Sequence, residues 1–170
     1  MNAELIEKKV ILNDEKLSSA LYNKSSFGAL VNNKLELSLT EALYLIEKEK
    51  IIVYDNKKQL TYDSFLKKAS RLDKKFMEKY KVYRDLRNRG FITKTALKYG
   101  ADFRVYEKGS RPGDEHATFT VLSVGEHDPF SWQEFSAMVR VAHTIRKGLL
   151  IAVVDDEGDV TYYSCSWQRL

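Results

Sequence analysis

Cysteine and proline are scarce in this chain of 170 residues, and long apolar runs are absent. Cys165 is the only cysteine, so the chain can form neither an intrachain disulfide nor a cysteine-rich zinc site. We expect Cys165 to occupy a packed or partly exposed strand position rather than to act as a nucleophile. No apolar run approaches the roughly 18 residues of a membrane-spanning helix, and the charged N-terminal segment has no apolar signal-peptide core. These absences predict a cytoplasmic protein.

Motifs of common hydrolases and metalloenzymes are also missing. None of the three histidines has a partner at zinc-binding spacing, and the chain has neither a G-x-S-x-G elbow nor a glycine-rich phosphate loop. A magnesium nuclease needs clustered carboxylates. Asp102, Glu107 and Glu115 are close in sequence, but the lysine expected two residues after a carboxylate is absent. We therefore predict no metal and no cofactor, with a metal-dependent DNA nuclease as an alternative.

What the chain does have is apolar side chains and positive charge. It is 44% hydrophobic and 12% aromatic, which is enough for a core, and it carries a net charge of +4. Arginine is concentrated late, because Arg71 is the only arginine before Tyr80. Arginine makes planar contacts with phosphates and bases, so an RNA partner would bind the second half.

Glycine and proline also divide the chain in two. Gly28 is the only glycine before Gly90, and both prolines lie in the second half. We predict a helix-rich N-terminal α/β domain over residues 1–79, and a C-terminal domain of strands and tight turns over 80–170. The fold class is therefore α+β.

Hydrophobic periodicity predicts the elements of each half. For the first half we expect strands over 8–13, 35–38 and 51–55, and helices over 14–23, over 39–50 behind a Ser38–Glu41 capping box, and from Thr61 through Phe76. For the second half we expect a helix over 80–90, strands beginning at 91 and over 101–109, 116–124, 149–155 and 160–167, and a helix behind a Ser131–Glu134 capping box. This order predicts a mixed sheet with helices packed on it.

Three side chains suit metal-free cleavage of RNA, which carries its own nucleophile in the 2′-hydroxyl. Tyr106 and His116 could serve as base and acid, and Lys147 could stabilise the charge that develops on phosphorus. Tyr106 ends one predicted strand and His116 opens the next, so a hairpin would bring them together. Each also has a purely structural interpretation, namely a strand-face aromatic, a hydrogen-bonded loop histidine and a charge at a helix C-terminus.

Several stretches resemble the archaeal tRNA-splicing endonucleases. They are "YRDLRNRGFITKTALKYGADFRVYEKG" (83–109), "EHATFTV" (115–121) and "RVAHTIRKGLLIAVVDDEGDVTYY" (140–163). "SLTEALYLIEK" (38–48) is similar to the N-terminal domain of the same family. The resemblance covers nearly the whole chain and is densest from 80 to 163.

The resemblance implies a function and a mechanism. Members cut introns from precursor tRNA at a bulge–helix–bulge motif, without metal, and leave a 2′,3′-cyclic phosphate and a 5′-hydroxyl. The family's catalytic tyrosine, histidine and lysine match Tyr106, His116 and Lys147, as base, acid and transition-state clamp, although the sequence leaves open which of the first two takes which proton. The implied C-terminal fold is restriction-endonuclease-like, with a central mixed sheet flanked by helices.

The resemblance also implies RNA contacts. The family stacks a bulged base between two side chains, for which we expect Arg140 and Trp167, although Trp167 could equally be a strand packing residue. Arg146 and Arg104 are candidates for phosphate contacts, or for pairs with carboxylates.

A homotetramer is expected, because a single-repeat chain with a full triad needs several copies to cut two sites. The acidic loop that the family inserts into a neighbouring subunit matches 125–129, with Glu126 and Asp128 as its charges, and the strand over 160–167 should pair between subunits. A non-catalytic subunit of such an assembly, or a requirement for an unlike partner, stays open.

Overall fold

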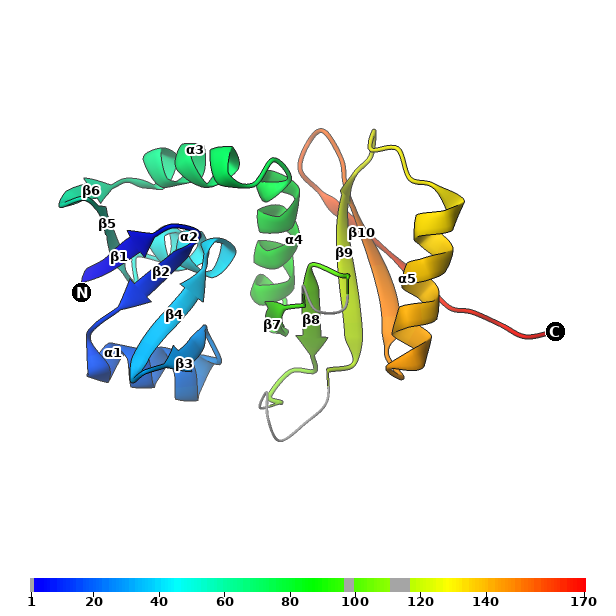
Figure 1. The fold of residues 1–170 in the computed structure, drawn as a ribbon, viewed down its shortest axis with the longest axis horizontal. Coiled ribbons are helices and arrows are strands. Elements are labelled where there is room, and N and C mark those ends of the chain that lie inside the picture. The colour runs from blue at the N-terminus through cyan, green and yellow to red at the C-terminus, as the bar shows by residue number, and fades with distance from the viewer. Residues whose placement is uncertain (1, 97–99, 111–116) are drawn as a thin grey trace. The chain divides into compact units, whose positions relative to one another are not determined.

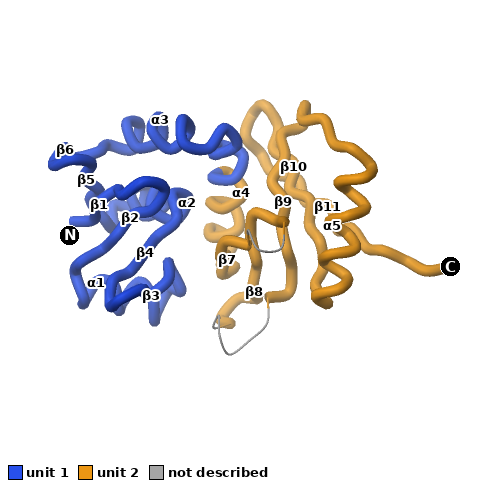
Figure 2. Tube along the Cα trace, viewed as in Figure 1, with its two compact units in different colours: residues 1–80 blue, residues 81–170 orange. Residues whose placement is uncertain are grey.

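The computed structural model describes residues 2–96, 100–110 and 117–170. The chain divides into two compact units, residues 1–80 and residues 81–170 (Figure 2). The predicted boundary lies one residue earlier, and as a boundary between separate domains it stays a prediction. None of the described helices is long and apolar enough to cross a membrane.

Unit 1 is built on a six-stranded sheet (Figure 1). Its strands are β1 (Asn2–Ile6), β2 (Lys9–Leu12), β3 (Ala29–Val31), β4 (Lys34–Ser38), β5 (Ile52–Asp55) and β6 (Lys58–Leu60), in the order β3-β4-β2-β1-β5-β6. The β1–β5 pair is parallel, and the other pairs are antiparallel. Buried Val10, Leu35 and Val53 contribute to the core from three of these strands.

The helices of unit 1 begin at identifiable caps. They are α1 (Glu15–Ser19), which continues as the π-helix η1 (Ala20–Lys24), then α2 (Leu39–Glu47) and α3 (Tyr62–Leu72). The predicted Ser38–Glu41 capping box is present at α2. The Glu41 carboxylate also accepts a 2.8 Å hydrogen bond from the Gly28 backbone N–H. Gly28 has a φ of +63°, and a Cβ there would lie 2.5 Å from the Glu36 carbonyl oxygen, so this position requires glycine.

Two sequence predictions for this unit are wrong. The unit is not dominated by helices, because it has three short strands, β1, β3 and β6, that were not predicted. Strands β3 and β6 belong to hairpins, whose turns are formed by Asn32–Asn33 and Asn56–Lys57. All four turn residues have positive φ. The helix expected from Thr61 through Phe76 ends at Leu72. Asp73 is extended there, with φ −139° and ψ 114°, and a new helix begins at Phe76.

Unit 2 contains a five-stranded mixed sheet, as predicted. Its strands are β7 (Ile92–Thr95), β8 (Phe103–Tyr106), β9 (Phe119–Gly125), β10 (Gly148–Val154) and β11 (Val160–Cys165), in the order β11-β10-β9-β8-β7. The β9–β10 pair is parallel and the other pairs are antiparallel. The parallel pair puts the start of β9 and the start of β10 at the same edge of the sheet.

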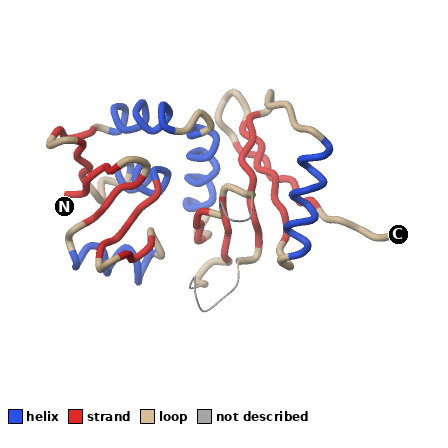
Figure 3. Tube along the Cα trace, viewed as in Figure 1, coloured by secondary structure: helices blue, strands red, loops and turns tan. Residues whose placement is uncertain are grey.

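Helices cover both faces of this sheet (Figure 3). On one face α4 (Phe76–Asn88) brings Tyr83 to a ring-centroid distance of 5.8 Å from Phe103. On the other face α5 (Trp132–Thr144) begins at the predicted Ser131–Glu134 capping box, and its Val139 and Ala142 pack with Leu149 of β10. Because the 80–90 helix is the later part of α4, its predicted start was four residues late.

Candidate functional site

The face of the sheet that α5 covers also carries Tyr106. Register pairs Arg104 with Thr120 and Thr120 with Leu149, so these three side chains share the face on which Leu149 meets α5. Tyr106 lies two residues beyond Arg104 on β8, and therefore on the same face. Its side chain is buried, with 5% exposed.

Lys147 is fixed at the edge where α5 ends and β10 begins. Its backbone N–H donates to the Ala142 carbonyl at 2.9 Å, and the preceding Arg146 takes a positive φ of 55° that turns the chain into the strand. The Lys147 ammonium then donates a 2.7 Å hydrogen bond to the carbonyl of Ala117. The lysine is thus tied to the segment that leads into β9.

His116 lies outside the described residues, whereas Ala117 and Thr118 after it are described. Ala117 follows it directly and accepts the Lys147 hydrogen bond. Thr118 then donates its N–H to the Val105 carbonyl at 2.8 Å, next to Tyr106. Lys147 therefore contacts Ala117, and the end of β8 contacts Thr118. These are the two residues that follow His116 in the sequence. Such an edge could hold a base, an acid and a cation around one phosphodiester.

Two other tyrosines already donate their hydroxyl protons to carboxylates. Burial raises the pKa of Tyr162 far above its ordinary value, and its hydroxyl donates a 2.8 Å hydrogen bond to the Asp85 carboxylate, which raises that pKa further. Burial likewise raises the pKa of Tyr80, which donates to Glu47. Both phenols therefore keep their protons, and their role is to hold α4 and its neighbours together.

Three of the four predicted RNA-contact residues lie around the second half of α5 and after β11, whereas Arg104 lies on β8. Arg140 is exposed on the helix, and Arg146 is exposed just past its end. Trp167 is half-exposed beyond the end of β11, and its ring lies 5.1 Å from the ring of His143, centroid to centroid. Sequence reasoning missed His143, although its place three residues after Arg140 puts both on one side of the helix.

Lys94 is a second residue that sequence reasoning missed. The β7–β8 register places it directly opposite Arg104, and both side chains are partly exposed. Tyr106, two residues beyond Arg104 on β8, shares this face of the sheet.

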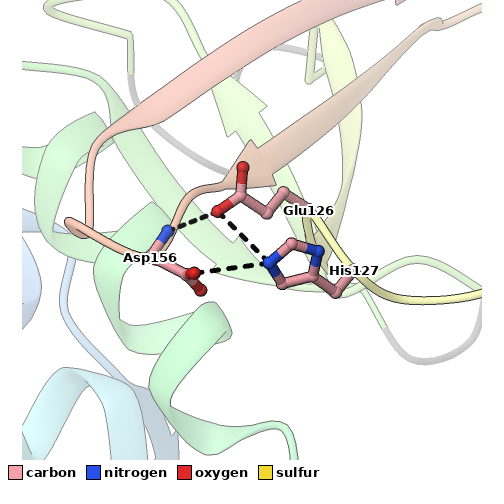
Figure 4. Close-up of side chains that lie close together, drawn as sticks. All are labelled: Glu126, His127 and Asp156. Atoms are coloured by element: carbon pink, nitrogen blue, oxygen red, sulfur yellow. Dashed lines mark hydrogen bonds and ion pairs between the residues drawn. The ribbon is translucent and has the colours of Figure 1, made fainter.

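The opposite edge of the sheet is acidic. Glu126 follows β9, and its carboxylate accepts a 2.7 Å hydrogen bond from the Asp156 backbone N–H in the turn after β10. His127 Nε2 lies 3.3 Å from an Asp156 oxygen and 3.8 Å from a Glu126 oxygen, and its imidazole points between the two carboxylates (Figure 4). Asp128 accepts the Gly125 N–H at 2.9 Å. The predicted loop charges therefore have a neighbour that was not predicted, the 155–159 turn.

Among the described residues, Glu126, His127 and Asp156 are a group that could hold a divalent cation, since their ligand atoms all lie within 4.8 Å of one another. All three are exposed. The group lies beyond the carboxyl ends of β9 and β10, whereas Lys147 lies before their amino ends. Each strand has seven residues, which separates the two edges by about 20 Å. A cation at the acidic edge could not reach a phosphodiester held at Lys147.

Fold and site together define an α+β protein whose mixed sheet has Tyr106 and Lys147 at one edge and acidic side chains at the other. Two family models match the chain. Residues 76–162 match the model described as "tRNA intron endonuclease, catalytic C-terminal domain", and residues 1–66 match "tRNA intron endonuclease, N-terminal domain".

Curated relatives agree over most of the chain. A tRNA-splicing endonuclease of Thermococcus onnurineus is 46% identical over 91% of this chain and 89% of the relative. One of Methanothermobacter thermautotrophicus is 39% identical over 99% of this chain and 98% of the relative, and one of Methanococcus vannielii is 40% identical over 99% and 94%. The chain belongs to the tRNA intron endonuclease family, which confirms the predicted family and fold class.

Proposed function

We propose that this chain is an endonuclease that cuts introns from precursor tRNA at a bulge–helix–bulge motif, without a metal ion, and leaves a 2′,3′-cyclic phosphate and a 5′-hydroxyl. The observation that carries the chemistry is the hydrogen bond from the Lys147 ammonium to the Ala117 carbonyl, one residue after His116. Membership of the tRNA intron endonuclease family indicates the substrate, precursor tRNA. The cleavage motif, the independence from metal and the product ends are tested by the experiment below.

In the proposed reaction, the RNA attacks its own backbone. The 2′-oxygen forms a bond to phosphorus while the bond from phosphorus to the 5′-oxygen breaks. Tyr106 and His116 act as the base that takes the 2′-hydroxyl proton and the acid that protonates the leaving oxygen, and we assign them in that order. Lys147 stabilises the negative charge that develops on the phosphorus oxygens.

RNA recognition in this proposal uses shape and charge. Arg140 and Trp167 hold a bulged base by stacking, which tolerates any base because every base has a π-face. Arg104 with Lys94 opposite it, and Arg146, contact phosphates. These contacts follow the helix α5 and the strands β7 and β8, which also carry the proposed chemistry.

We propose a homotetramer as the active assembly. The acidic edge of the sheet, formed by the loop 125–129 and the turn 155–159, enters a basic surface of a neighbouring subunit. The backbone hydrogen bond from Asp156 to Glu126 supports this, because it joins both acidic segments into one surface. Strand β11 is the outer strand of its sheet, and it can pair with the same strand of another subunit.

The decisive experiment is cleavage of an intron-containing precursor tRNA by the purified chain in EDTA. We expect unchanged rates, and products with 2′,3′-cyclic phosphate and 5′-hydroxyl ends. His116→Ala should lower the maximal rate by about 10²–10⁴-fold, the range for a lost proton-transfer group, while RNA affinity stays at the wild-type value.

Loss of cleavage in EDTA would instead support a metal-dependent nuclease. Normal cleavage by His116→Ala would remove His116 from the mechanism while leaving the substrate assignment intact.

A further inference from the structure

One contact in unit 2 has no part in the reaction described so far. His143 lies in the last turn of α5 and Trp167 lies two residues past the end of β11. Their ring centroids are 5.1 Å apart and the ring planes are inclined by 55°. This is within the range of about 4.5–7 Å in which aromatic pairs attract each other.

The two rings are carried by elements that share a core. Cys165, the last residue of β11, packs against the cluster of Val139, Ala142 and Leu149. The described β10–β11 ladder ends at the Leu149–Cys165 pair. Trp167 therefore leaves the sheet close to α5, and the His143 ring is the described contact that can set the direction of the indole.

The indole has an accessible side beyond this contact, since 47% of Trp167 is exposed. Arg140 is exposed three residues before His143, on the same side of α5. A stacking site binds tightly when its rings are already oriented, because no rotamer freedom is then lost on binding. The contact places the indole on the side of α5 that also carries Arg140, whose Nε donates to the Ser136 carbonyl at 3.3 Å.

We propose that His143 is a positioning residue that holds the Trp167 indole beside Arg140 for stacking on an unpaired nucleobase of the RNA. This rests on the proposed function. His143 acts through Trp167 and does not touch the reacting atoms. It therefore affects binding of RNA, and leaves the chemical step alone.

Single-turnover cleavage of precursor tRNA, with enzyme in excess, separates these effects as a half-saturating enzyme concentration and a maximal rate. Trp167→Ala should raise the half-saturating concentration by about 5- to 160-fold, the scale of one base–aromatic stack. His143→Ala should raise it by about 2- to 10-fold, the scale of an aromatic pair. Both should leave the maximal rate unchanged, and His143→Phe, which keeps the ring, should restore wild-type behaviour.

A double variant shows whether His143 works through Trp167. In the Trp167→Ala background, His143→Ala should add no further loss. Gln133→Ala, an exposed change at the start of the same helix, is the matched control and should leave both constants unchanged.

Fluorescence tests the contact without RNA. Trp132 and Trp167 are the two tryptophans, so Trp132→Phe leaves Trp167 as the sole emitter. Compared with the Trp132→Phe protein that retains His143, acrylamide should quench Trp167 fluorescence more strongly after His143→Ala. After His143→Phe the quenching should equal that of the His143 protein. Equal quenching in all three proteins would overturn the contact.

The kinetic outcomes also separate the two proposals. If the wild type cleaves no precursor tRNA, the proposed function fails, while quenching still tests the contact. If Trp167→Ala weakens binding and His143→Ala does not, only the positioning role is overturned. If His143→Phe binds RNA as weakly as His143→Ala, the aromatic ring is not what His143 contributes, and the positioning role is again overturned.

Discussion

At the scale of single residues, Lys147 shows how the fold prepares one side chain. The positive φ of Arg146, the backbone bond to Ala142 and the ammonium bond to Ala117 fix both ends of the lysine. A charge held in place beforehand needs no reorganisation when negative charge develops.

Lys147→Met keeps the length of the side chain and removes its charge. We expect the maximal rate of precursor cleavage to fall by about 10²–10³-fold, as when one preorganised electrostatic group is lost. RNA affinity should change little. Lys147→Arg keeps the positive charge but replaces the compact ammonium with a planar guanidinium. Its maximal rate should lie between those of the wild type and Lys147→Met. A Lys147→Met enzyme with the wild-type maximal rate would remove the lysine from the mechanism.

Asp73 gives a pH-dependent contribution to stability in unit 1. Burial alone would raise the pKa of Asp73, but the hydrogen bonds from Lys79 and from the Lys75 backbone outweigh it and lower the pKa. A lowered pKa in the folded state means that the ionised form stabilises the fold. The contribution is therefore complete above the unfolded pKa, and is lost as the pH falls through the folded one.

We expect Asp73→Asn to lower the free energy of unfolding at pH 7 by up to about 1 kcal/mol, since the pair is partly exposed. The asparagine oxygen still accepts the Lys75 N–H, so the change isolates the charge. Urea unfolding at neutral and at acidic pH measures the difference, which should vanish in acid. A difference that persists unchanged in acid would contradict the assignment.

At this scale the sequence predicted where two candidate catalytic residues lie, whereas their roles stay predictions. Tyr106 and Lys147 were predicted at a strand end and a helix–strand junction, and both lie there. Lys94, His143 and Asp156 were missed, because what distinguishes them is a neighbour far away in sequence, a cross-strand partner or a ring beyond the sheet. Hydrophobic periodicity predicts the helix or strand to which a residue belongs, but not the residues of other elements that contact it.

At the scale of elements, the start of β10 depends on a glycine. Gly148 lies opposite Phe119 in the parallel pair, and a Cβ there would be 2.6 Å from the Phe119 ring. The close approach of β9 and β10 thus requires glycine directly after Lys147.

We expect Gly148→Ala to cost about 1–3 kcal/mol of stability through overpacking. It should also lower the maximal rate of cleavage, because any shift of β10 moves Lys147 away from Ala117. Gly125→Ala is the matched stability control, since its added Cβ would meet only Asp128 atoms at 3.6 Å or more. Equal unfolding free energies for the two variants would contradict the packing argument.

The elements that sequence predicted best are those with a strong local signal. Both capping boxes start their helices as expected, and the apolar run of β10 is a strand flanked by β9 and β11. The three missed strands of unit 1 are three to five residues long, and two of them are held by turns rather than by apolar alternation. The break at Asp73 was missed because the apolar spacing continues through it, whereas the backbone does not.

At the scale of the whole molecule, the two edges of the unit 2 sheet serve different proposed purposes. In the proposal, the edge at Lys147 carries out the reaction, and the edge at Glu126 and Asp156 contacts a neighbouring subunit. The proposed tetramer should therefore respond to charge at one edge, while the intrinsic chemistry should not.

We expect Glu126→Lys with Asp156→Lys to convert the proposed tetramer to smaller species, measured by light scattering during size-exclusion chromatography. Opposite charges that steer two surfaces together become repulsive after the reversal. Glu4→Lys, an exposed change in unit 1, is the control and should keep the native mass. A tetramer that survives the double reversal would place the contact elsewhere.

The parallel pairing of β9 and β10 has a consequence for how such a protein can diversify. Codons for 126–129 and 155–159 can be randomised together in a gene library without altering a residue proposed for transesterification. Selection for new partner subunits could then change the acidic edge of the sheet, while the edge at Lys147 stays unchanged.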